Sequence, residues 1–99
     1  MIIVLGTLDL ANGDADSARA LLDTLVTQTR AEDGCIDYAF AIDVLDKGRL
    51  RISEKWRDRP ALDAHLESAH LAAFREGISK IGLSGSDVQV FEADAGRPL

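Results

Sequence analysis

The chain is poor in residues that would stabilise or mark several classes of protein. Cys35 is the single cysteine among 99 residues. It therefore has no partner for an internal disulfide or for a CxxC metal or redox motif. A lone cysteine fits a reducing compartment, so a cytoplasmic location is predicted.

Basic residues are scarce relative to acidic ones. Eleven Lys and Arg residues face 17 Asp and Glu residues, for a net charge of −6. This balance argues against nucleic-acid binding and against attraction to an anionic membrane surface. No apolar run approaches the roughly 20 residues of a membrane span. The start, MIIVLGTLDL, lacks the basic region and cleavage site of a signal peptide. No nucleic-acid partner and no membrane association are expected.

Common cofactor and catalytic motifs are also missing. There is no GxGxxG, no P-loop and no GxSxG. The two histidines, His65 and His70, are five residues apart, which is about 140° around a continuous helix. Helical metal sites commonly use an i, i+4 pair instead. The sequence therefore predicts no cofactor and no metal, with His70 at the surface or a pocket rim.

What is present is an alternation of strand and helix patterns. Apolar periods of two and of 3.6 residues predict the order β-α-β-β-α-β. The strands are expected at 2–10, 35–45, 49–57 and 87–92, and the helices from about 14–17 to 32 and at 60–80. Asp46-Lys47-Gly48 is the expected hairpin turn. Residues 1–99 should form one domain, with 93–99 as an exposed, flexible tail.

This order predicts an α+β, ferredoxin-like fold, in which one four-stranded antiparallel sheet carries both helices on one face. One side of the first strand is apolar and should meet the core: Ile2, Val4, Gly6, Leu8 and Leu10. Three strands also carry apolar residues on their other side. Such a face is an association surface, and a symmetric homodimer packed sheet on sheet is the simplest way to cover it.

The junction between the third strand and the second helix carries the most chemistry. Glu54 stands between Ile52 and Trp56 on an apolar strand face. Pro60 suits the first helical turn, and His65 follows beside the helix's apolar stripe. A carboxylate, an indole and an imidazole can therefore share one cavity.

Each of these residues has a structural and a functional interpretation. A buried Glu54 requires a partner. It either ties strand to helix, for example through His65, or orients His65 in a catalytic relay. His65 either packs at the pocket edge or acts as a general base or substrate anchor. The aromatic residues are core candidates first and pocket walls second: Tyr38, Phe40, Trp56 and Phe74.

Taken together, these residues resemble the antibiotic biosynthesis monooxygenase (ABM) domain, of the dimeric α+β barrel group. The similarity extends from the first strand to the last and rests on these elements: Gly34-Cys35, Tyr38, Glu54-x-Trp56, Leu62-x-x-His65, Ser68-x-His70 and Phe74. The resemblance implies homodimers with a pocket between sheet and helices. Family members include cofactor-free oxygenases of phenols and quinols, haem-degrading enzymes, and enzymes that isomerise or clear small signalling molecules.

The haem-degrading members use an Asn on the first strand and a Trp and a His on the second helix. This chain has no Asn in residues 2–10. His65 stands about where that Trp would be, and Arg75 about where that His would be. A haem-degrading role is therefore excluded.

The resulting hypothesis is a cofactor-independent monooxygenase for a small electron-rich aromatic, such as a quinol or polyphenol. His65 would be the base and Glu54 would hold it, with an aromatic substrate pocket formed by Trp56, Phe40, Tyr38 and Phe74. Two alternatives stay open. One is a non-catalytic or stress-related module that binds a small hydrophobic molecule. The other is an isomerase or signal-molecule-processing enzyme on the same scaffold.

Overall fold

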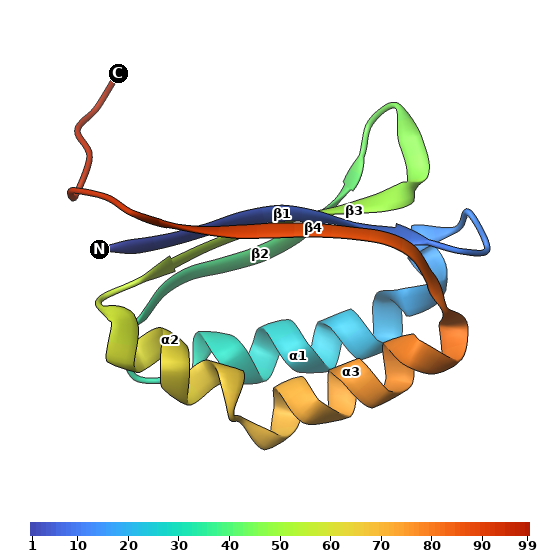
Figure 1. The fold of residues 1–99 in the computed structure, drawn as a ribbon, viewed down its shortest axis with the longest axis horizontal. Coiled ribbons are helices and arrows are strands. Elements are labelled where there is room, and N and C mark those ends of the chain that lie inside the picture. Colours follow the sequence, from blue (N-terminus) through green and yellow to red (C-terminus); the bar gives the residue numbers. More distant parts are fainter.

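A computed structural model describes residues 1–99 and has the predicted ferredoxin-like architecture (Figure 1). Four strands form one sheet, and all helices lie below one of its faces. The strands are β1 Ile2–Leu10, β2 Cys35–Asp43, β3 Asp46–Trp56 and β4 Leu83–Glu92. The helices are the 3₁₀ turn η1 Ala15–Ala18 and the α-helices α1 Arg19–Arg30, α2 Arg59–Leu66 and α3 Ala69–Ile81.

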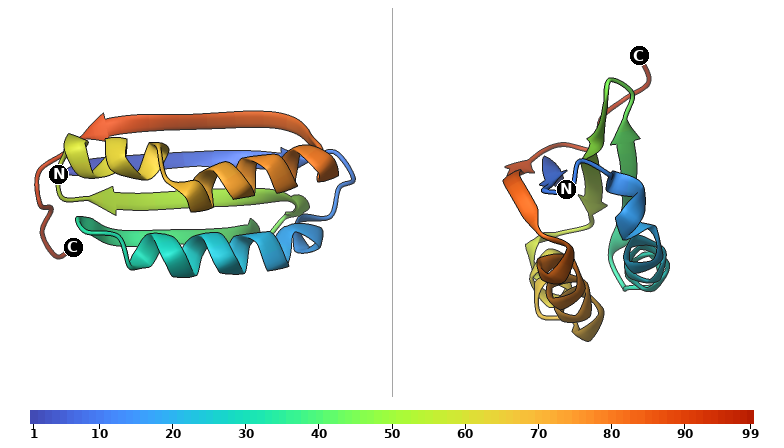
Figure 2. Two further views of the ribbon diagram at one scale, coloured as in Figure 1. Left: turned by 90° about the horizontal axis from the view of Figure 1, so that it is seen from below. Right: turned by 90° about the vertical axis from the view of Figure 1, so that its right-hand side faces the viewer.

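The sheet has the order β2-β3-β1-β4, with every neighbouring pair antiparallel. Seen from the helix side in Figure 2, α1 runs along the β2 side of the sheet, and α2 and α3 follow one another on the β4 side. Val4 of β1 pairs with Glu54 of β3, which in turn pairs with Tyr38 of β2. Side chains of paired residues share a face, so Glu54 and Tyr38 both point toward the helices.

The core lies between the sheet and the helices, and the predicted apolar side of β1 faces it. Ile2, Val4, Leu8 and Leu10 are all buried. Helices α1 and α3 approach closely at Gly77, where an added Cβ would lie 2.6 Å from Cδ2 of Leu21. The missing side chain therefore allows the close contact between these two helices.

The prediction of a single helix over 60–80 is wrong, because two helices occupy this range. Asp58 caps α2 by accepting a hydrogen bond from the Ala61 amide, and Pro60 lies in its first turn. Helix α2 ends at Leu66. Ser68, in an extended conformation, then caps α3 by accepting a hydrogen bond from the Leu71 amide. The Ser68 hydroxyl also donates to the His65 carbonyl over 2.7 Å, so one side chain joins the two helix ends. Helix α3 ends at Ile81, close to the expected end at residue 80, and Gly82 caps it with a φ of 93°.

The hairpin turn, the start of β4 and the register of β2 also differ from the prediction. The hairpin turn lies at Val44 and Leu45, ahead of the expected Asp46-Lys47-Gly48, which extends β3. Strand β4 begins at Leu83 and includes serine and glycine residues that were expected to be loop, because pairing with β1 satisfies their backbone groups. A register shift between Cys35 and Asp37 leaves Ile36 exposed, although strict alternation along residues 35–45 would place it on the same face as Tyr38.

The other face of the sheet carries no helix (Figure 1). Leu5 is 48% exposed and Phe91 is 45% exposed. Alternation along β1 places Leu5 on this face, opposite the buried Val4. Phe91 of β4 pairs with Ile3 of β1, so it lies on the same face. None of the helices combines the length and apolar character required to cross a lipid bilayer.

Candidate functional site

A cavity of about 440 Å³ lies between the helix-covered face of the sheet and helices α2 and α3. Twenty residues line it, and 14 of them are hydrophobic, so the cavity suits a small apolar or aromatic molecule. Its ionisable wall residues include Glu54 from β3 and His65 from α2. The cavity predicted at the strand–helix junction is therefore present, and it brings this carboxyl and this imidazole to one wall.

Two aromatic rings hold the imidazole of His65, which is only 2% exposed. The ring centroid lies 4.9 Å from that of Trp56 and 5.2 Å from that of Tyr38. These contacts fix the ring orientation and remove water from around it. The burial lowers the pKa of His65 below its usual value, although hydrogen bonding to Glu32 acts in the opposite direction.

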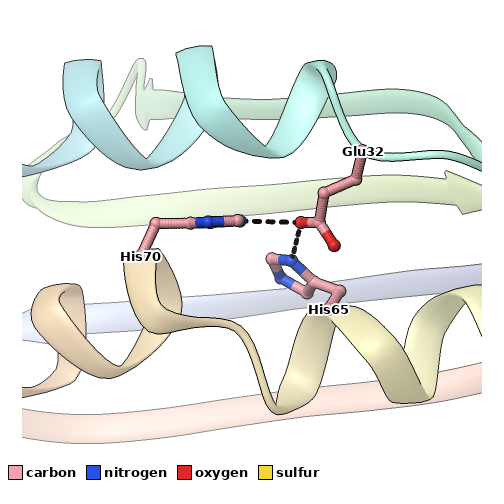
Figure 3. A group of neighbouring side chains, drawn as sticks. All are labelled: Glu32, His65 and His70. Carbon is pink, nitrogen blue, oxygen red and sulfur yellow. Dashed lines mark hydrogen bonds and ion pairs between the residues drawn. The ribbon is translucent and has the colours of Figure 1, made fainter.

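Glu32, in the turn after α1, is the hydrogen-bond partner of His65. Figure 3 shows its carboxylate between two imidazoles. His65 Nδ1 lies 2.6 Å from Glu32 Oε2, and His70 Nε2 lies 2.8 Å from the same oxygen. The expected pairing of His65 with Glu54 is therefore wrong. The predicted separation of the two histidines by about 140° fails as well, because it assumed one continuous helix.

The chemistry of Glu32 determines the tautomer of His65. An ionised carboxylate only accepts hydrogen bonds, so Nδ1 of His65 must carry the proton and donate it. No protein group hydrogen-bonds the other ring nitrogen, Nε2. A neutral imidazole in this tautomer has its lone pair on Nε2 and can accept a proton there, and His65 is one of the residues that line the cavity.

Glu54 has a different environment. Its Oε1 accepts a hydrogen bond from the indole Nε1 of Trp56 over 2.8 Å, and no protein donor reaches Oε2. The side chain is buried, with 7% of the residue exposed. Burial raises the pKa of the Glu54 carboxyl; the Trp56 hydrogen bond lowers it in part, and the nearby charge of Glu32 raises it further. The cavity wall therefore presents a carboxyl group that takes up a proton readily.

The aromatic residues divide into two groups. Tyr38, Phe40 and Phe74 line the cavity, as expected for substrate-pocket residues. Burial raises the pKa of the Tyr38 phenol well above its usual range, with the charge of Glu54 acting in the same direction. Trp56 is fully buried and is not part of the cavity wall, so it supports Glu54 and His65 from behind.

Sequence reasoning missed Glu32 and did not place His70 beside His65. Ser68 could have indicated that His70 lies on a separate helix from His65, because serine is a preferred residue immediately before the start of a helix. Glu32 had no comparable signal: it is 33 residues from His65 and follows the end of a different helix. Only the packing of α1 beside α3 brings these groups together.

The sequence and the overall fold are similar to those of known proteins. The sequence profile described as "Antibiotic biosynthesis monooxygenase" matches residues 1–77. This chain belongs to the antibiotic biosynthesis monooxygenase family. The region of this chain that matches the ABM family includes Glu54 and His65 of the cavity wall. It also includes Glu32 and His70.

Two relatives illustrate the similarity. The Mycobacterium tuberculosis protein Rv0793, named as a candidate monooxygenase, is 45% identical over 69 residues, a match that spans 69% of this chain and 67% of that protein. Its solved structure has a TM-score of 0.82, with 32% identity, and covers 96% of this chain and 98% of that one. A Deinococcus radiodurans structure described as a candidate antibiotic biosynthesis monooxygenase has a TM-score of 0.90 and 26% identity, covering 100% of this chain and 98% of that one.

Proposed function

We propose that this ABM protein is a cofactor-independent monooxygenase that acts on a small electron-rich aromatic, such as a quinol or polyphenol. The observation that carries the proposal is the pair formed by Glu32 and His65 at the wall of an apolar cavity. The carboxylate holds the Nδ1 proton, and the Nε2 lone pair is left for the substrate. The family membership and the relative named as a candidate monooxygenase support the same class of reaction.

The proposed reaction requires a base more than any other group. A neutral quinol reacts slowly with dioxygen, whereas its phenolate transfers an electron readily. His65 Nε2 takes the hydroxyl proton, and the Glu32 carboxylate stabilises the resulting imidazolium. One oxygen atom of dioxygen then bonds to the ring, and the other leaves as water. The balanced change is quinol plus dioxygen to hydroxyquinone plus water, and the quinol supplies all four electrons.

The remaining cavity residues orient the substrate in this proposal. Oε2 of Glu54 has no protein partner, so it can hydrogen-bond the second hydroxyl group of a quinol. Tyr38, Phe40 and Phe74 provide aromatic surfaces for the ring. Trp56 acts indirectly by holding Oε1 of Glu54.

The functional unit in this proposal is a homodimer. The sheet face opposite the helices exposes Leu5 and Phe91, and a second copy packed on it would remove this apolar surface from water. The active cavity lies on the helix side of the sheet, so each subunit keeps its own site.

Oxygen uptake with a panel of quinols tests the proposal. The purified protein should consume dioxygen and form the hydroxyquinone, and His65→Ala should reduce kcat about 10²–10⁴-fold. An anaerobic arm separates the alternatives, because an isomerase would turn over without dioxygen. Thermal shifts with ligands but no product from any of them would favour a binding module and contradict the proposal.

A further inference from the structure

Glu32, His65 and His70 also make up a set of metal ligands. Their ligand atoms, Glu32 Oε2, His65 Nδ1 and His70 Nε2, all lie within 4.8 Å of one another. Two imidazole nitrogens and one carboxylate oxygen are the donor set of many three-ligand zinc sites, which complete their coordination with water. We propose that this cluster binds one divalent transition metal ion of the zinc type.

The distances require only a small rearrangement. Zinc binds imidazole nitrogen and carboxylate oxygen at about 2.0–2.2 Å, so tetrahedral neighbours are about 3.3 Å apart. The two hydrogen bonds to Glu32 Oε2 measure 2.6 and 2.8 Å, so the pairs must open by about 0.7 and 0.5 Å on that geometry. Glu32 lies in a turn, where its side chain can move without disturbing a helix or strand.

The cluster is open to solvent on one side. The side chains of Glu32 and His70 are each 15% exposed, whereas that of His65 is 2% exposed. An ion can therefore enter past the first two residues and reach the buried imidazole last. The Glu32 carboxylate supplies a negatively charged oxygen, which attracts a cation.

The metal would lie behind His65 as seen from the cavity. Glu32 and His70 are not part of the cavity wall, and His65 Nδ1 faces them. A metal on Nδ1 displaces its proton and leaves the ring protonated on Nε2, so the imidazole can no longer accept a proton there. If His65 is the base of the proposed function, metal binding switches that base off. The ion is thus an inhibitor of the proposed oxygenation.

Isothermal titration of untagged, metal-free protein with Zn²⁺ tests the binding. The chain has only two histidines, so no other imidazole contributes. We expect one ion per chain, and a loss of affinity of at least about tenfold in His70→Gln and in Glu32→Gln. The exposed carboxylate next to the site provides a matched control: Glu67→Gln should bind like the wild type. Circular dichroism verifies that each variant is folded.

Proton NMR adds a direct readout, because the ring resonances of both histidines should shift on zinc addition. Unchanged affinity in folded His70→Gln would overturn the proposal, and so would loss of binding in Cys35→Ser, which would indicate a thiol ligand. These measurements do not depend on turnover, so they distinguish failure of the metal site from failure of the proposed oxygenase function. In an active preparation, excess Zn²⁺ should suppress oxygen uptake and EDTA should restore it. Zinc binding with undiminished uptake would contradict the inhibitory role.

Discussion

The carboxylate of Glu32 accepts a hydrogen bond from Nδ1 of His65 over 2.6 Å, across 33 residues of sequence. This contact assigns the imidazole proton to Nδ1 and leaves the lone pair on Nε2. It also links the end of α1 to the end of α2, so a loop carboxylate controls a group at the cavity wall.

The first prediction concerns this positioning role. Glu32→Gln retains a side-chain oxygen that can accept the Nδ1 hydrogen bond but removes the charge that stabilises an imidazolium. We expect kcat for quinol oxygenation to fall at least about tenfold, because removal of such a charge weakens the base. KM should stay the same, since Glu32 does not line the cavity. Steady-state oxygen-uptake kinetics measure both constants. Glu32→Asp should recover part of kcat, and an effect confined to KM would contradict the role.

The second prediction concerns the buried carboxyl of Glu54 and pH. Burial raises the folded-state pKa of Glu54 above the unfolded value, so folding favours the protonated form. The contribution of protonated Glu54 to the stability of the folded protein is fully present below the unfolded-state pKa. It is lost as the pH rises through the folded-state pKa. Glu54→Gln stays neutral at every pH, so it should melt on the order of a few degrees higher than wild type at pH 8. The difference should shrink toward pH 4. Thermal unfolding followed by circular dichroism gives both curves, and a constant difference would contradict the assignment.

The third prediction concerns the hydrogen bond from Trp56 to Glu54. Trp56→Phe keeps an aromatic ring but leaves Oε1 of a buried carboxyl without its donor. Loss of a buried partner costs about 1–3 kcal/mol, and the smaller ring adds a packing loss. Urea unfolding at pH 7 measures the change in the free energy of unfolding. Phe74→Leu provides a packing control without a hydrogen bond. Combining Trp56→Phe with Glu54→Leu should recover stability relative to Trp56→Phe alone, and additive losses would argue against the coupling.

The fourth prediction concerns the sheet face without helices. Sedimentation velocity should give the mass of a dimer for the wild type. Leu5→Glu places a charge in the middle of the apolar face and should shift the protein to a monomer. Thr27→Glu, on the exposed side of α1, is the matched control and should remain dimeric. A dimer that survives Leu5→Glu would place the interface elsewhere.

Much of this fold follows from local pattern. The alternation in residues 2–10 predicts a strand with one buried side, and Ile2, Val4, Leu8 and Leu10 are indeed buried. Such patterns are readable because neighbouring side chains on one element report its period directly. Phe40 and Phe74 were expected in the core first and at a pocket wall second; both line the cavity, and Phe74 is also buried in the core.

The break between α2 and α3 did not emerge from the same reasoning. The apolar spacing of Leu62, Leu66, Ala69 and Ala73 continues across the break and favours one helix. The Ser68 hydroxyl instead satisfies backbone groups at both helix ends, and this local capping outweighs the continuous period. The periodicity of apolar residues shows which side of a helix is apolar, but it does not reveal a helix end that is set by a capping hydrogen bond.

The sequence by itself determined the order of elements, the buried sides of β1 and β3 and the presence of a carboxyl and an imidazole near one junction. Tertiary structure alone decided which carboxylate holds His65, because Glu32 reaches it only when α1 packs beside α3 at Gly77. Contacts between residues far apart in the chain depend on how whole helices and strands pack. A short stretch of sequence therefore does not reveal that Glu32 and His65 are in contact.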